Sequence, residues 1–111
     1  METAKIDSAE NQIVWTDTLE YDAVGPVLRS GEIAEAVIDA MCEDNPGRQV
    51  YVTDRGDYLH VHILNDCRLT RDSLSRCLGR EYQLARLEIE MPAFSGRMRT
   101  SDSEYRWYFN S

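Results

Sequence analysis

The sequence predicts one α+β domain in which two helices pack against mostly antiparallel strands. Its 111 residues, 42% of them hydrophobic, suit a single domain with a modest core. Several short runs alternate apolar and polar residues, as half-buried strands do, and two segments carry apolar residues at helical spacing. The predicted order is β-α-β-β-α-β-β-β. We expect a mobile N-terminal tail over residues 1–20 and the folded domain over residues 21–111.

Charge and composition narrow the classes of partner. The net charge of -8 and the pI near 4.6 oppose binding to nucleic acid or to an anionic membrane, and favour a basic protein partner. No apolar run approaches the roughly 18 residues that span a bilayer. The three cysteines form no Cys-x-x-Cys pair, which fits a reducing compartment. We therefore expect a cytoplasmic protein.

The first 20 residues are mostly polar, and Trp15 is their most conspicuous apolar side chain. Trp15 either docks on the domain or waits for a partner, and the sequence favours neither alternative. The first ordered element is predicted over Ala23–Arg29 as an extended strand. Because proline cannot donate a ladder hydrogen bond, Pro26 indicates a strand at the rim of the sheet.

A helix is predicted to follow, with Ser30 as its N-cap and a stop at Asp44-Asn45-Pro46-Gly47. Its last turns carry Asp39, Glu43 and Asp44 with no cation nearby in sequence to balance the negative helix end. This acidic end is either a solvated face or a docking surface for Arg and Lys of a partner.

The middle of the chain predicts a β-hairpin and a second helix. Gln49–Thr53 and Tyr58–Leu64 alternate around a turn that contains Gly56. Thr70 and Gly79 then bracket a short amphipathic segment as its N-cap and its C-terminal glycine.

A long strand is expected over Tyr82–Met91, where Leu87, Ile89 and Met91 alternate with glutamates. Pro92 stops this strand, so Pro92–Gly96 is predicted to be a loop with Phe94 at its tip. Phe94 is either tucked under the sheet or offered to a partner. Two further strands are expected at residues 97–100 and 105–109, joined by a turn.

Few residues suggest chemistry. His60 and His62 share one strand face and could bind a metal, but no third ligand is evident. The sequence has no nucleophile elbow, His-Glu-x-x-His motif, phosphate loop or dinucleotide fingerprint. Nothing nominates a catalytic pair, so we expect a protein that is not an enzyme.

From about Val24 to Phe109 the chain resembles the regulatory, effector or coupling proteins of bacterial multicomponent diiron monooxygenases. The resemblance rests on collinear short motifs and is to the toluene and alkene branch, because methane-type relatives carry small hydroxylic residues where this chain has Pro92, Ala93 and Phe94. The motifs are Val24–Gly31, Asp44–Gly47, Val52–Tyr58, and Leu78–Arg80 with the following Tyr82–Met91.

This resemblance implies a cofactor-free regulator that binds the large subunit of a diiron hydroxylase. It would control substrate and oxygen access, couple electron transfer to hydroxylation or epoxidation, and compete with the electron-donating ferredoxin or reductase. The implied hydroxylase contacts are the first strand, the helix exit and the Phe94 loop: Val24, Gly25, Pro26, Leu28, Arg29, Asp44, Asn45, Pro92, Ala93, Phe94, Ser95 and Gly96. The alternatives are an α+β interaction module unrelated to oxygenases and a small metal-binding protein using His60 and His62.

Overall fold

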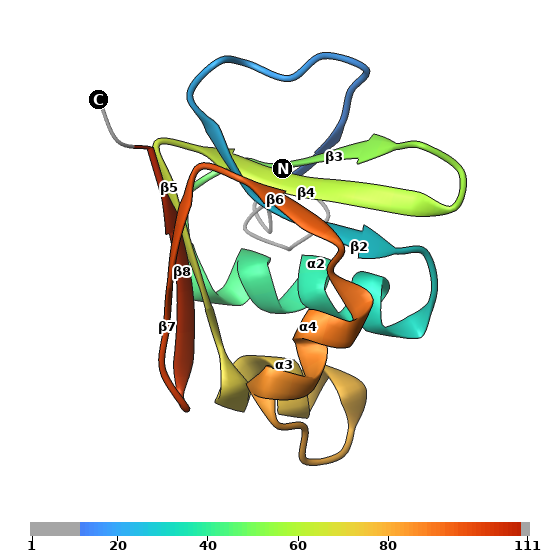
Figure 1. Cartoon of the computed structure of the whole chain (residues 1–111), viewed down its shortest axis with the longest axis vertical. Helices are drawn as coiled ribbons and strands as arrows, with labels where there is room; N and C mark the ends of the chain where they lie inside the picture. The colour runs from blue at the N-terminus through green and yellow to red at the C-terminus, as the bar shows by residue number, and fades with distance from the viewer. Residues whose placement is uncertain (1–11, 110–111) are drawn as a thin grey trace, which may run out of the picture.

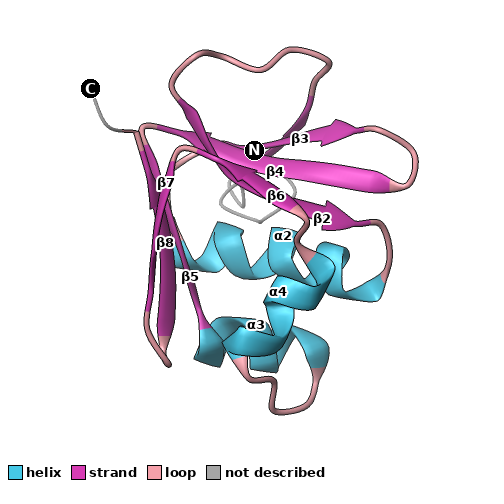
Figure 2. Ribbon diagram, viewed as in Figure 1, coloured by secondary structure: helices cyan, strands magenta, loops and turns pink. Residues whose placement is uncertain are grey.

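Residues 12–109, which the computed structural model describes, form two β-sheets and a layer of helices (Figure 1). The first sheet has the strand order β1-β3-β4-β2-β6 and the second has β5-β8-β7. Helices α2, α3 and α4 lie on one side of the five-stranded sheet, and the second sheet stands beside them at a steep angle (Figure 2). The elements are β1 (Ile13–Trp15), β2 (Ala23–Arg29), α2 (Glu32–Asp44), β3 (Val50–Asp54), β4 (Tyr58–Leu64), β5 (Asp66–Thr70), α3 (Arg71–Leu78), the 3-10 helix η2 (Leu84–Arg86), α4 (Leu87–Glu90), β6 (Ala93–Ser95), β7 (Arg97–Thr100) and β8 (Glu104–Tyr108). The α+β prediction is confirmed.

The core lies between the five-stranded sheet and α2. The predicted hairpin is confirmed, since β3 and β4 pair antiparallel with Val52 opposite Val61. Alternate residues of both strands are buried against α2, which contributes Val37 and Met41. The opposite face of the hairpin carries Tyr51, Thr53, His60 and His62, so the period-two pattern separates a packed face from a more polar one.

The ends of α3 agree with the sequence, whereas the start of α2 does not. The Thr70 hydroxyl accepts a 3.2 Å hydrogen bond from the Ser73 amide, and Gly79 closes α3 in the left-handed conformation. The predicted N-cap Ser30 is wrong. Gly31 occupies that position, and the Ser30 hydroxyl instead donates a 2.7 Å hydrogen bond to the carbonyl of Gly56.

The long strand predicted over Tyr82–Met91 is wrong. This segment contains η2 and α4, and the next extended element, β6, begins only at Ala93. The buried side chains are Leu84, Leu87 and Met91, at spacings of three and four residues, while Ile89 is 73% exposed. This spacing is helical, so the apparent alternation at residues 87–91 coincided with one face of a short helix.

The rim of the first sheet also differs from expectation. β2 is not an edge strand, because β6 pairs along it with Phe94 opposite Pro26. The mobile tail predicted over residues 1–20 needs correction as well. Ile13–Trp15 forms β1 and pairs in parallel with β3, whereas residues 1–11 of that prediction lie outside the described part of the chain.

The second sheet contains a strand that the sequence analysis missed. β5 connects the hairpin to α3 and pairs antiparallel with β8. Its inward residues Cys67 and Leu69 pack with Trp107 of β8, and all three are almost completely buried. The predicted strands at residues 97–100 and 105–109 are confirmed as β7 and β8, with the second shifted to start at Glu104.

Candidate protein-docking site

The segment predicted as the Phe94 loop is a short edge strand. β6 lies at the free edge of the first sheet, between Pro92 and Gly96. Phe94 is 44% exposed, so about half of its ring surface is open to a partner. An aromatic side chain that is partly exposed at a sheet edge is a typical anchor for protein binding.

The segments directly before and after β6 are fixed to the rest of the domain. Before it, Leu87 and Met91 fix α4 to the core, and the Tyr105 hydroxyl donates a 2.6 Å hydrogen bond to the Glu88 carboxylate. After it, Gly96 adopts φ 87°, where a Cβ atom would lie 2.5 Å from Val24 Cγ1. Only glycine fits this bend without displacing the core, so the strand leaves the first sheet here and enters the second as β7.

A polar chain ties β6 to the outer face of the sheet. His60 Nε2 lies 3.2 Å from the Ser95 hydroxyl, which donates a 3.5 Å hydrogen bond to the carbonyl of Gly25. Burial lowers the pKa of His60, opposed in part by its hydrogen bond to the Gly25 backbone. His60 is therefore a neutral positioning contact for Ser95 at pH 7.

His62 lies next to His60, with ring centroids 5.0 Å apart, and it stacks on Tyr51. Burial, and to a smaller extent His60, lowers the pKa of His62 to about 4. Its Nε2 lies 3.3 Å from the Thr53 hydroxyl. Within residues 12–109, no group of three or more His, Cys, Asp and Glu side chains could hold a metal ion.

The structure divides the predicted contact residues by accessibility. Val24, Gly25, Pro26 and Leu28 of β2 are buried, because β2 lies between β4 and β6 instead of at the rim. A rigid partner cannot reach them. In this chain they support the β6 edge, and their role as direct hydroxylase contacts stays a prediction.

The remaining predicted residues of this region are accessible. Arg29 is exposed at the end of β2, two residues beyond Val27, which pairs with Ala93 of β6. Pro92, Ala93 and Gly96 are also exposed, and Ser95 is half-buried. We define the β6 edge as Arg29, Pro92, Ala93, Phe94, Ser95 and Gly96.

Asp44 and Asn45 at the end of α2 are engaged within the chain. The Asp44 carboxylate accepts hydrogen bonds of 2.7 Å from the Thr70 amide and 2.7 Å from the Ser73 hydroxyl. The Asn45 side chain is buried and exchanges hydrogen bonds with the Arg68 backbone. These groups fasten α2 to β5 and α3, which corrects the interpretation of this acidic end as unbalanced.

Glu43 on the same helix forms a 2.5 Å ion pair with Arg76 of α3. Asp39 is exposed, and partial desolvation followed by the nearby charges of Glu43 and Glu35 raises its pKa. Glu43 and Asp44 thus have partners on α3 and at its start, whereas the surroundings of Asp39 oppose its ionisation.

Two surface features were missed by the sequence analysis. Ile89 of α4 is exposed close in sequence to Phe94, and the outer face of the second sheet gathers arginines from three strands. Trp15, predicted to lie in a tail, is 60% exposed on β1 at the opposite edge of the first sheet from β6. A helical interpretation of residues 84–91 would have identified Ile89 as a surface residue.

Most of the chain matches a known protein family. The sequence model of the MmoB/DmpM family matches residues 22–108. The chain belongs to the MmoB/DmpM family. The resemblance noted in the sequence is thereby confirmed.

Among curated proteins, this family member is 54% identical over 95 residues to the effector subunit of an alkene monooxygenase system from Xanthobacter autotrophicus (strain ATCC BAA-1158 / Py2). The alignment covers 86% of this chain and 94% of that protein. The chain is therefore similar to an effector subunit of the alkene branch over nearly the whole length of that protein.

Solved structures share the fold at low sequence identity. A chain from a phenol hydroxylase–regulatory protein complex superposes with a TM-score of 0.68 at 17% identity, covering 79% of this chain and 99% of that one. The soluble methane monooxygenase regulatory protein B gives 0.59 at 21% identity, covering 96% and 75% respectively. In residues 12–109, no helix is long and apolar enough to cross a membrane.

Proposed function

We propose that this chain is the non-catalytic effector subunit of an alkene- or toluene-type multicomponent monooxygenase, and that it binds the large subunit of the diiron hydroxylase in the cytoplasm. The 54% identity to an alkene monooxygenase effector subunit, over nearly the whole of that protein, carries the proposal. The fold shared with a chain of a phenol hydroxylase–regulatory protein complex supports a hydroxylase as the partner.

The β6 edge is the proposed contact. It combines the accessible aromatic ring of Phe94 on β6 with the cationic side chain of Arg29 at the end of the neighbouring strand β2. Burying an aromatic side chain completely contributes about 1.5–3 kcal/mol, and Phe94 begins half-exposed, so complex formation gains part of this amount. Because the strand is already ordered, little entropy is lost when the partner binds.

An effector changes a hydroxylase only by binding one of its conformations more tightly than another. A tenfold shift in population requires about 1.4 kcal/mol of differential binding energy. Phe94 alone gains roughly half of 1.5–3 kcal/mol, so the other exposed residues of the β6 edge must contribute to a tenfold shift. The cofactor-free chain thus regulates substrate and oxygen access through binding energy alone, and it competes with the ferredoxin or reductase for the hydroxylase surface.

The test is titration of this protein into a reconstituted alkene- or toluene-type hydroxylase with its electron-transfer proteins, following product formed per NADH consumed. We expect a saturable rise that levels near one protein per active site. Raising the concentration of the electron donor should raise the half-saturating concentration of this protein if the two compete.

The variants Phe94→Ala and Trp15→Ala locate the contact, because each truncates an exposed aromatic at an opposite edge of the same sheet. Phe94→Ala should raise the half-saturating concentration roughly tenfold while changing stability by less than about 1 kcal/mol. Loss of coupling in Trp15→Ala alone would assign the contact to β1 and contradict the β6 edge. No effect of the wild-type protein on several such hydroxylases would contradict the effector function itself.

A further inference from the structure

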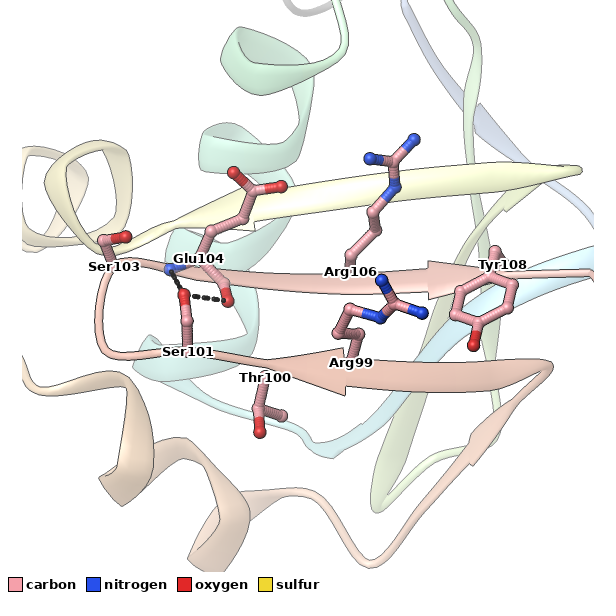
Figure 3. Close-up of a pocket in the computed structure, with 7 residues that line it drawn as sticks. All are labelled: Arg99, Thr100, Ser101, Ser103, Glu104, Arg106 and Tyr108. Atoms are coloured by element: carbon pink, nitrogen blue, oxygen red, sulfur yellow. Dashed lines mark hydrogen bonds between the residues drawn. The ribbon is translucent and has the colours of Figure 1, made fainter.

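The outer face of the second sheet carries a row of arginines. Arg68 of β5 is directly opposite Arg106 of β8, and Arg106 is directly opposite Arg99 of β7. Figure 3 shows Arg99 and Arg106 side by side on neighbouring strands, with Tyr108 next along β8. Like charges directly opposite each other destabilise a sheet, so this row has an energetic cost.

The concentration of positive charge is unusual for an acidic chain. The net charge of the protein is -8, yet five of its twelve Lys and Arg residues lie on this face or form an ion pair with it. These five are Arg48, Arg68, Arg97, Arg99 and Arg106. Two carboxylates on these strands form ion pairs with some of the arginines. Asp66 pairs with Arg48 at 3.3 Å and with Arg106 at 3.0 Å, and Glu104 pairs with Arg68 at 3.3 Å.

Two of the arginines have no acidic partner. Among residues 12–109, no carboxylate lies within ion-pair distance of Arg97 or Arg99. The guanidinium of Arg99 lies 5.8 Å from the centre of the Tyr108 ring, which orients it without neutralising it. An open hollow of about 510 Å³ lies over this part of the sheet, lined by Arg99, Arg106, Tyr108, Glu104 and residues at the β7–β8 turn. The positive face is therefore accessible.

The dimensions favour a protein segment over a small anion. Neighbouring strands are about 4.8 Å apart, so the three arginines span about 10 Å. A separate carboxylate for each arginine requires several acidic groups at similar spacing, which side chains on successive turns of a helix or along a strand supply. The net charge of -8 opposes approach to nucleic acid.

We propose that this arginine face, comprising Arg68, Arg97, Arg99, Arg106 and Tyr108, docks a carboxylate-rich segment of the hydroxylase. The inference rests on the proposed effector function and adds a second contact of stated chemistry. β7 continues from β6 through the single residue Gly96, so the arginine face and the β6 edge belong to one run of chain. The acidic segment neutralises Arg97 and Arg99, and it steers association because exposed charges act before contact.

The experiment compares variants that make the same change in net charge at different places. Arg97→Gln with Arg99→Gln removes two charges from the face, and neither side chain forms an ion pair with another residue of 12–109. Arg55→Gln with Arg86→Gln removes two exposed arginines elsewhere, from the β3–β4 turn and η2. Each is titrated into the hydroxylase at about 50 mM and 200 mM NaCl, and thermal unfolding verifies that both remain folded.

We expect the face variant to raise the half-saturating concentration about tenfold at low salt and to weaken its dependence on salt, with the maximal coupling unchanged. The control pair should change it less than about twofold. Equal effects of both pairs, or none, with an active wild-type protein would overturn the arginine face and leave the effector function standing.

Three other outcomes would also overturn the proposed occupant. A wild-type protein that neither binds nor activates any hydroxylase contradicts the effector function and the occupant together. Sedimentation that shows self-association at low salt, abolished in the face variant, would assign the arginines to a second copy of this chain. Competition of hydroxylase binding by millimolar inorganic phosphate, at constant ionic strength, would instead indicate a small-anion site.

Discussion

The Tyr105 hydroxyl donates a 2.6 Å hydrogen bond to the Glu88 carboxylate, joining β8 of the second sheet to α4, the helix directly before the β6 edge. Tyr105 is buried, and burial followed by the Glu88 contact raises its pKa. The bond therefore persists in neutral and mildly alkaline solution. It connects the position of Phe94 to the sheet that bears the arginine face.

Tyr105→Phe should lower the free energy of unfolding by about 1 kcal/mol, because the exposed Glu88 carboxylate can rehydrate when the hydroxyl is removed. Chemical denaturation at pH 7 measures this loss. Glu88→Gln is the matched variant, since it keeps an acceptor oxygen and should cost less than Tyr105→Phe. Equal stability of Tyr105→Phe and the wild type would show that the bond contributes nothing.

Asp44→Ala should destabilise the protein by roughly 2–3 kcal/mol, because its carboxylate accepts charge-assisted hydrogen bonds from Thr70 and Ser73 at the start of α3. Denaturant unfolding measures the change. Asp39→Asn on the same helix is the control. Its neighbours Glu43 and Glu35 repel it, so neutralising it should leave stability equal or slightly higher. Equal losses in both variants would contradict the role of Asp44 in fastening α2 to the start of α3.

The sequence predicted best where local chemistry decides the structure. The caps of α3 follow from Thr70 and Gly79, and the β3–β4 hairpin follows from strict alternation around Gly56. The prediction of a long strand over Tyr82–Met91 was wrong because the apolar residues at 87–91 fit both a period of two and a helical spacing. Tertiary burial of Leu84, Leu87 and Met91 selects the helix.

The candidate site depends on pairing between distant segments, which local patterns do not contain. Pro92 and Gly96 marked Phe94 as a candidate contact residue. The strand that carries it forms because β6 pairs with β2, nearly 70 residues away in sequence. Val24 and Leu28, which were expected to contact the hydroxylase, are instead buried in the core cluster that contains Val37 of α2. The arginine row likewise appears only when β5, β8 and β7 are placed in register.

Gly96→Ala should lower stability by roughly 2–5 kcal/mol, since the new methyl group would meet Val24 Cγ1 at 2.5 Å and the Tyr108 carbonyl oxygen at 2.8 Å. Gly56→Ala is a matched control with a similar positive φ of 84° but no atom within 4 Å of the added Cβ. It should cost about 1 kcal/mol from backbone strain alone. Thermal unfolding of the pair separates strain from the clash, and equal losses would contradict the close approach at Gly96.

His62 should make the protein less stable as the pH falls below neutrality. Its pKa drops from the ordinary 6.5 to about 4 on folding, so between these values the unfolded chain binds the proton and the folded chain does not. The stabilising effect is complete above pH 6.5 and disappears as the pH falls towards 4. The loss amounts to about 3 kcal/mol, since one pKa unit corresponds to 1.36 kcal/mol.

Unfolding free energies at pH 7, 5.5 and 4.5 measure this slope in the wild type and in His62→Gln. The variant should lose most of the slope, whatever its absolute stability at pH 7. His60→Gln should remove a smaller part, because the pKa of His60 is lowered in the same direction. The carboxylates titrate in all three proteins and cancel in the comparison, so an unchanged slope in His62→Gln would show that the imidazole is not held neutral by burial.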